Sequence, residues 1–142
     1  MKKLVYVLVI VVAYVAYERF LIPELPASTA RPISAPLSAP GERWQSGQQV
    51  RGGGKVLRIL SDDNTGDRHQ RFMLKLNSGQ TLLIAHNIDL APRIPSLKEG
   101  VFVLFHGQFE ENAQGGVVHW THDDPQGRHV DGWLEHNGQR YQ

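Results

Sequence analysis

The fold class is decided by one stretch of sequence, Arg71-Phe72-Met73-Leu74-Lys75-Leu76-Asn77-Ser78-Gly79-Gln80-Thr81-Leu82-Leu83-Ile84-Ala85-His86. In residues 71–76 every second side chain is Phe or Leu, and this period of two is typical of a half-buried strand. Asn77-Ser78-Gly79 then offers the residue types of a turn, after which residues 81–86 continue as an apolar run. The stretch therefore predicts two strands joined by a turn.

Outward from this pair the chain shows further short strands and no convincing run of helical period. Residues 55–60 follow the glycine run 52–54 as an expected first strand, and the turn-forming series 61–67 ends it. Two more strands are expected at residues 101–109 and 117–121. We therefore expect an all-β fold, a small five-stranded OB-like barrel, a class that usually receives ligands on its second and third strands.

Two tryptophans are expected to be buried by this barrel. Trp120 has the same parity as Val118, so on a regular strand both side chains point into the core. Trp133 lies in a glycine-containing tail and is expected to pack that tail back onto the barrel.

Residues 1–22 have the composition of a signal anchor or signal peptide. Lys2 and Lys3 precede an apolar run from Leu4 to Tyr17 that resumes up to Ile22, and such lysines stay in the cytoplasm. We expect residues 4–22 to anchor the chain in the inner membrane with the domain facing the periplasm or cell exterior. The alternative is cleavage near residues 28–30 and export.

Residues 23–43 are interpreted as a Pro-rich linker and residues 44–142 as the OB-like β domain. Five of the eight prolines fall between Pro23 and Pro40, a composition typical of an extended spacer. The domain has ten Lys and Arg against eleven Asp and Glu, a formal charge of −1. This balance argues against a uniformly basic nucleic-acid binder, and the absence of cysteine excludes disulfide scaffolds and thiol chemistry.

Polar side chains on the second expected strand are candidates for ligand binding. His69, Arg71 and Lys75 have the same parity and should project from one face of that strand. With His86 they form a candidate contact surface for an anionic ligand, to which an arginine gives bidentate contacts. The alternative is a solvated strand face.

A second candidate site is a metal centre formed by His119, His122, Asp124 and His129. Imidazole and carboxylate suit a divalent ion such as zinc, which needs three or four ligands at about 2.0 to 2.2 Å. Residues 119 and 122 point to opposite faces of a regular strand, so both reach one ion only if the strand ends or bulges near Thr121. The oxygen-rich loop 62–67 is explained by turn chemistry rather than by calcium.

Three separated polar motifs occur in a fixed order: Arg68-His69-Gln70-Arg71-Phe72, then His86-Asn87-Ile88-Asp89-Leu90-Ala91-Pro92-Arg93-Ile94-Pro95, then His119-Trp120-Thr121-His122 with Asp124-Pro125 and Gly127-Arg128-His129. With the anchor-plus-domain layout they resemble the bacterial family filed as domain of unknown function 3465, over residues 54–142. The resemblance implies a membrane-anchored or exported small β domain and implies no activity, cofactor or ligand. Asp123 stands where that family commonly has a second His, which weakens a metal site based on paired imidazoles.

Two functions remain open from the sequence. The first is a tethered binding module for an oligoanion, a single-stranded nucleic acid or an acidic oligosaccharide, contacted by His69, Arg71, Lys75 and His86. The second is a metal-assisted hydrolase or phosphodiesterase, in which the metal activates water, His69 or His86 acts as general acid or base, and Arg71 clamps the phosphate. No nucleophile elbow, phosphate loop or zincin motif occurs in the sequence, which favours the binding module.

Overall fold

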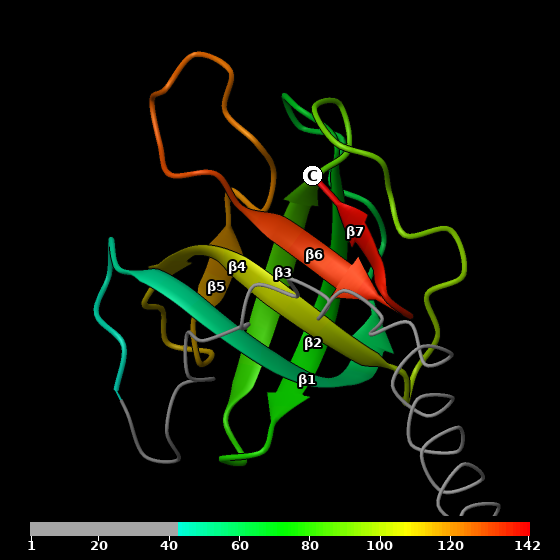
Figure 1. The fold of residues 1–142 in the computed structure, drawn as a ribbon. Helices are drawn as coiled ribbons and strands as arrows, with labels where there is room; N and C mark the ends of the chain where they lie inside the picture. Colours follow the sequence, from blue (N-terminus) through cyan, green and yellow to red (C-terminus); the bar gives the residue numbers. More distant parts are fainter. Residues whose placement is uncertain (1–42) are drawn as a thin grey trace, which may run out of the picture. The chain divides into compact units, whose positions relative to one another are not determined.

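The computed structural model describes residues 43–142, and this part of the chain is built from β-strands and their connections (Figure 1). The strands are β1 (Gln49–Ile59), β2 (His69–Leu76), β3 (Thr81–Asn87), β4 (Phe102–Glu110), β5 (Val117–His119), β6 (Trp133–His136) and β7 (Gln139–Tyr141). The first strand begins before the glycine run rather than after it, and the fifth ends two residues before the expected Thr121. The predicted strand positions are otherwise confirmed to within a few residues.

Five of the strands close into a barrel. They are ordered β1-β2-β3-β5-β4, and β4 pairs with β1 to complete the circle. The β3–β5 pair is parallel, whereas the other barrel pairs are antiparallel. This confirms the all-β class and the five-stranded OB-like barrel.

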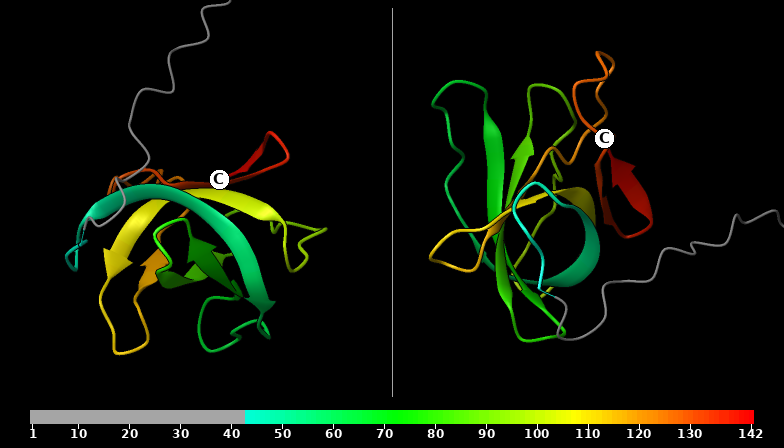
Figure 2. Two further views of the ribbon diagram at one scale, coloured as in Figure 1. Left: turned by 90° about the horizontal axis from the view of Figure 1, so that it is seen from below. Right: turned by 90° about the vertical axis from the view of Figure 1, so that its left-hand side faces the viewer.

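A C-terminal hairpin, absent from the sequence-based expectation, extends the sheet beyond the barrel. One edge of β4 pairs with β5 near Gln108 and with β6 between Leu104 and His106, so that both strands share that edge. β6 and β7 are joined by Asn137 and Gly138, whose φ values of 52° and 76° belong to the left-handed region that a type I′ hairpin turn requires. Figure 2 shows this hairpin projecting beside the curved β1 and β4.

The barrel interior is filled by the inward-facing residues, which are every second residue along each strand. The largest fully buried side chains include Phe72, Leu74, Leu82, Ile84 and Phe105, and burial of each such side chain contributes about 1.5 to 3 kcal/mol. A Cβ atom on Gly52 would lie 2.7 Å from the ring of Phe105, so a glycine is needed where β1 crosses this ring.

The two tryptophan predictions have different outcomes. Trp133 is only 8% exposed, and Cζ of Arg51 on β1 lies 5.0 Å from its ring centroid, which confirms that Trp133 packs the C-terminal segment onto the barrel. Cζ of Arg140 lies 4.3 Å from the same centroid. Trp120 is 37% exposed, so the prediction that it is buried was wrong. The reason is a backbone turn at Trp120 itself, described below.

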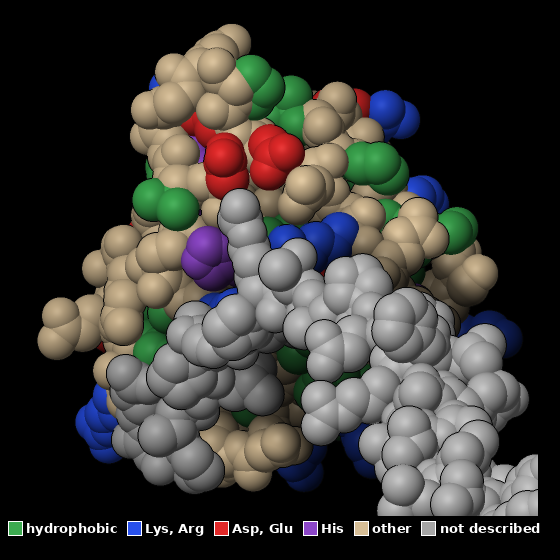
Figure 3. Space-filling model, viewed as in Figure 1, with side chains coloured by type: hydrophobic (Ala, Val, Ile, Leu, Met, Phe, Trp, Pro, Cys, Tyr) green, Lys and Arg blue, Asp and Glu red, His purple; other side chains and the backbone are tan. Residues whose placement is uncertain are grey.

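Lys, Arg, Asp and Glu side chains are interspersed on the described face that Figure 3 shows, in keeping with the nearly balanced charge of the domain. Between residues 43 and 142 there is no helix with the length and apolar character needed to cross a membrane. The expected anchor, residues 1–22, and nearly all of the expected linker, residues 23–43, lie outside the described residues.

Candidate functional site

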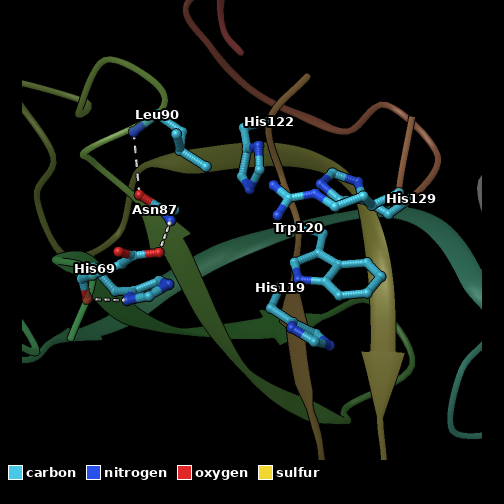
Figure 4. A pocket seen from close by; sticks show the side chains of 9 residues that line it. His69, Asn87, Leu90, His119, Trp120, His122 and His129 are labelled. Carbon is cyan, nitrogen blue, oxygen red and sulfur yellow. Dashed lines mark hydrogen bonds between the residues drawn. The ribbon is translucent and has the colours of Figure 1, made fainter. Parts of the chain in front are cut away.

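A cavity of about 370 Å³ opens on the outer side of the barrel, near the start of β2, the end of β3 and the end of β5 (Figure 4). The lining side chains are predominantly polar and come from separate segments of the chain: Asp67, His69, Asn87, Leu90, His119, Trp120, His122, Arg128 and His129. Four of the nine are histidines, and the segment 119–129 contributes five of the nine residues.

The wall formed by β2 and β3 follows from strand pairing. His69 and Asn87 are direct partners in the antiparallel ladder, so both outward side chains lie at one level of the barrel. Nδ1 of His69 donates to the main-chain oxygen of Asp67 at 2.8 Å, and Nδ2 of Asn87 donates to Oδ2 of Asp67 at 3.3 Å. The first residues of β2 and the loop before it therefore fix the orientation of the His69 ring.

The opposite wall depends on a backbone reversal at Trp120. β5 ends at His119, and Trp120 has φ = 52°, a left-handed conformation that a bulky residue rarely adopts. Because of this reversal, His119 and His122 both line the cavity, whereas Thr121 between them is fully buried. Although three positions separate the two histidines, both side chains reach the same cavity because the strand ends between them.

Gly132 permits the close chain approach that holds this reversal. A Cβ atom on residue 132 would lie 2.0 Å from the main-chain oxygen of Trp120 and 2.7 Å from that of His106. The amide of Gly132 also donates to the main-chain oxygen of His122 at 2.9 Å. The start of β6 therefore closes the loop that carries Arg128 and His129.

Asp124 organises that loop from beneath the cavity. Its carboxylate accepts hydrogen bonds from the amides of Gln126 at 2.9 Å, of Arg128, and of His129 at 3.0 Å. Burial acts to raise the pKa of Asp124, but these amide donors outweigh it and lower the pKa below its ordinary value. Asp124 is therefore an ionised anchor of the loop backbone.

His122 and His129 are held edge to face by this loop. Their ring centroids are 4.9 Å apart, and His129 stacks on Trp120 at 4.6 Å with 24° between the ring planes. Nδ1 of His122 donates to the main-chain oxygen of Asp123 at 2.7 Å, and Nδ1 of His129 donates to that of Val130 at 2.8 Å. These bonds leave Nε2 of His122 without a hydrogen-bond partner among the described residues, whereas Nε2 of His129 lies 3.9 Å from Oδ2 of Asp124.

His119 has a different environment from its neighbours. Burial lowers the pKa of His119, and the nearby carboxylate of Glu110 opposes part of this effect. Nε2 of His119 is buried without a hydrogen-bond partner, 4.0 Å from Oε1 of Glu110. The neutral form of His119 is thus favoured, while its ring edge remains part of the cavity wall.

The structure places His86 away from this cavity. His86 is fully buried in the barrel, with Nδ1 2.8 Å from Oγ1 of Thr121 and Nε2 3.0 Å from the main-chain oxygen of Pro92. Since a carbonyl only accepts, Nε2 carries the proton and Nδ1 accepts from the threonine hydroxyl. Burial lowers the pKa of His86 to about 4, so His86 is a neutral structural residue at neutral pH.

Arg71 and Lys75 share the outward face of β2 with His69 but do not line the cavity. Nε of Arg71 donates to the main-chain oxygen of Ser61 at 3.0 Å. The predicted common face of His69, Arg71 and Lys75 is present, and it leads away from the cavity along the strand.

A family model described as "Protein of unknown function (DUF3465)" matches residues 34–142. The chain belongs to the DUF3465 family. The match includes every strand of the barrel and every residue that lines the cavity. No curated protein and no solved structure matches the chain.

The metal site expected from the sequence is not assembled in the DUF3465 domain. His119, His122 and His129 line one cavity, but the carboxylate of Asp124 is turned to the loop amides. Among residues 43–142, no group of three or more His, Asp or Glu side chains is placed to hold a metal ion together.

Arg128, Asn87 and Asp67 of the DUF3465 domain line the cavity but are not among the site residues predicted from the sequence. A signal was present for Arg128, because Asp124-Pro125 and Gly127 mark a loop that presents a cation beside His129. Asn87 and Asp67 carry no such signal, since they reach the cavity through strand register and loop geometry.

Proposed function

We propose that this DUF3465 domain is an OB-like binding module for an oligoanion, held outside the cytoplasm by a membrane tether at residues 4–22. The observation that carries the proposal is the gathering of Arg128 with four imidazoles around one cavity, which is bordered by the start of β2, the end of β3 and the segment 119–129. OB barrels commonly bind oligonucleotides and oligosaccharides on strands two and three and their rim loops, and both of these strands border the cavity.

The chemistry of the cavity suits one unit of an anionic chain. A guanidinium group binds carboxylate or phosphate through two parallel hydrogen bonds, and the imidazoles around it add polar ring nitrogens to the cavity wall. The volume of about 370 Å³ is at the lower end of the range for small-molecule sites. Further units of the ligand would pass Arg71 and Lys75, which follow His69 on the outward face of β2.

Fluorescence anisotropy with labelled single-stranded DNA and a labelled acidic oligosaccharide tests the proposal on the purified 142-residue chain. We expect binding of one of them that weakens as salt is raised, and that Arg128→Ala reduces by about tenfold or more because a charge-assisted bidentate contact is lost. Lys98→Ala is the control, since it removes one cation that is exposed and does not line the cavity. Absence of salt-sensitive binding to both ligands contradicts the proposal.

A separate experiment tests on which side of the membrane the domain lies. Protease added outside intact spheroplasts should digest residues 44–142, whereas the same protease added to sealed inside-out vesicles should not. Digestion only in the vesicles would contradict the proposed orientation.

A further inference from the structure

We infer that the unit held in the cavity is an acidic sugar, a ring that carries one carboxylate and several hydroxyl donors, within an oligosaccharide. This inference rests on the proposed function and selects between its two ligand classes. It follows from the number and kind of hydrogen-bonding groups that the cavity walls leave free.

Two imidazoles present acceptors to the cavity. Nδ1 of His69 and Nδ1 of His122 lie 2.8 and 2.7 Å from main-chain oxygens, which only accept, so both nitrogens must carry the proton. In a neutral ring Nε2 then has a lone pair and no hydrogen. Neither Nε2 atom has a hydrogen-bond partner among the described residues, and His122 is only 3% exposed. A ligand that satisfies these atoms must supply hydroxyl or amide donors.

The base of the β2–β3 wall adds further acceptor capacity. The Asp67 carboxylate lines the cavity and accepts from Nδ2 of Asn87 through one oxygen, Oδ2, at 3.3 Å. The amide oxygen of Asn87 is already used, because it accepts from the amides of Asp89 at 2.9 Å and Leu90 at 3.2 Å. Asp67 is therefore a third group that favours hydroxyl donors on the ligand.

One permanently charged donor lines the cavity within the described residues, and it is Arg128. Its side chain is 66% exposed, and Nε lies 3.8 Å from Oδ2 of Asp124, which already accepts two loop amides. The guanidinium group thus retains donors for a carboxylate on the ligand. In Figure 4 the His69 ring faces the cavity from one wall and His122 from the other.

An acidic sugar matches this arrangement better than a phosphodiester chain does. Its carboxylate accepts from Arg128, and its hydroxyls donate to His69, His122 and Asp67. The backbone of single-stranded DNA carries acceptors and no donors, so its oxygens would face the imidazole lone pairs without a hydrogen between them. Leu90 and Trp120, 57% and 37% exposed, supply apolar surface for the C–H face of a sugar ring.

Calorimetry or anisotropy at pH 8, where imidazole in water is neutral, tests the inference on the purified 142-residue chain. The probes are oligogalacturonate and oligoalginate, their methyl esters, which keep the hydroxyls but lose the charge, and single-stranded DNA of equal charge. We expect at least one acid to bind about tenfold or more tightly than the DNA, and its ester to lose about tenfold or more.

Two variants test whether the imidazoles bind the ligand as hydrogen-bond acceptors, separately from the effect of the ligand's charge. His69→Phe and His122→Phe keep a ring but remove the acceptor, so each should weaken sugar binding by about tenfold and should not weaken DNA binding, whose oxygens lose an unfavourable contact with the lone pair. Because His122 is buried and its substitution can affect folding, His69→Phe alone suffices, with unfolding curves as a check. DNA binding as tight as or tighter than both acids overturns the inference and leaves the proposed function standing. Failure of all the charged probes overturns both.

Discussion

His86 and His69 are one hairpin apart, yet they have opposite surroundings. His69 faces the cavity, while His86 is sealed in the barrel between Thr121 and Pro92. The parity of the strand already separates them, because His86 continues the inward series of Leu82 and Ile84. The prediction of His86 on the ligand surface rested on residue type and not on parity.

The burial of His86 makes the stability of the domain depend on pH. Its pKa is about 4 in the fold and about 6.5 when exposed, so between these values only the unfolded chain takes up the proton. We therefore expect the His86 contribution to stability to be fully present above pH 6.5 and to fall by roughly 3 kcal/mol as the pH drops to 4. Urea unfolding at several pH values measures this change.

A variant isolates this contribution of His86. His86→Gln keeps a donor for Pro92 and an acceptor for Thr121 but does not titrate. We expect the variant to have a flatter stability profile than the native chain between pH 6.5 and 4. Parallel profiles for the two proteins would show that His86 does not carry the effect.

Trp120 shows why parity alone does not place every side chain. Its parity with Val118 predicts burial, but parity applies only while the strand continues, and β5 ends at His119. The chain reversal at Trp120, where φ is 52°, brings its main-chain oxygen against Gly132, a contact between positions twelve residues apart. A contact between residues so far apart in the chain cannot be predicted from a local sequence pattern.

Among the elements, the segment between β5 and β6 depends most on a single side chain. Asp124 accepts the amides of Gln126, Arg128 and His129, while its own amide donates to Oδ1 of Asp131 at 2.8 Å. These bonds bring Arg128 and His129 to the cavity without regular secondary structure. A carboxylate beside histidines is typical of a metal site, which is why the sequence predicts Asp124 as a metal ligand.

Asp124→Ala should release this segment. We expect faster hydrogen exchange at the amides of Arg128 and His129 and loss of ligand binding, because those amides lose their acceptor. Asp123→Ala is the matched control, since the Asp123 side chain is exposed and only its main-chain oxygen is used, by His122. Equal exchange rates in the two variants would rule out the anchoring role of Asp124.

The crossing of β4 and β5 requires a residue without a side chain. A Cβ atom on Gly107 would lie 2.5 Å from the main-chain oxygen of His119 and 2.9 Å from Cγ2 of Thr121. Gly107→Ala should therefore cost about 1 to 3 kcal/mol in urea unfolding, the usual cost of overpacking. Lys75→Ala, an exposed change on β2, should stay within about 0.5 kcal/mol. If the Gly107→Ala protein were as stable as that control, β4 would be able to shift and accommodate the Cβ atom without loss of folding stability.

For the whole molecule, the barrel was predictable and its extension was not. Alternation within residues 71–76 and the turn at Asn77-Ser78-Gly79 are local signals, and they correctly gave the central strands. Asn137-Gly138 is a comparable signal for the β6–β7 hairpin and was overlooked. Cavity formation could not be predicted from periodicity, because His69, His119 and Arg128 meet only after the barrel closes.

The polar side chains on the outward face of β2 define the direction in which a long ligand would extend from the cavity. From His69 to Lys75 the strand rises about 20 Å, at roughly 3.3 Å per residue. We expect affinity to increase with ligand length until the chain covers this distance and then to level off, as measured by anisotropy over a series of oligomers. Arg71→Ala and Lys75→Ala should weaken long ligands and spare the shortest one. A loss that is the same at every length would place both residues outside the binding path.

The parallel junction of β3 and β5 is the narrowest seam of the barrel, with only the pairs Leu83–Val117 and Ile84–Val118. Asn87 and His119, which lie just beyond it on the two strands, are on facing sides of the cavity. A ligand that contacts both residues would link β3 to β5 and add to the two backbone pairs that join these strands. Pulled apart mechanically, the occupied barrel should therefore give way at a higher force than the empty one, and at a different place.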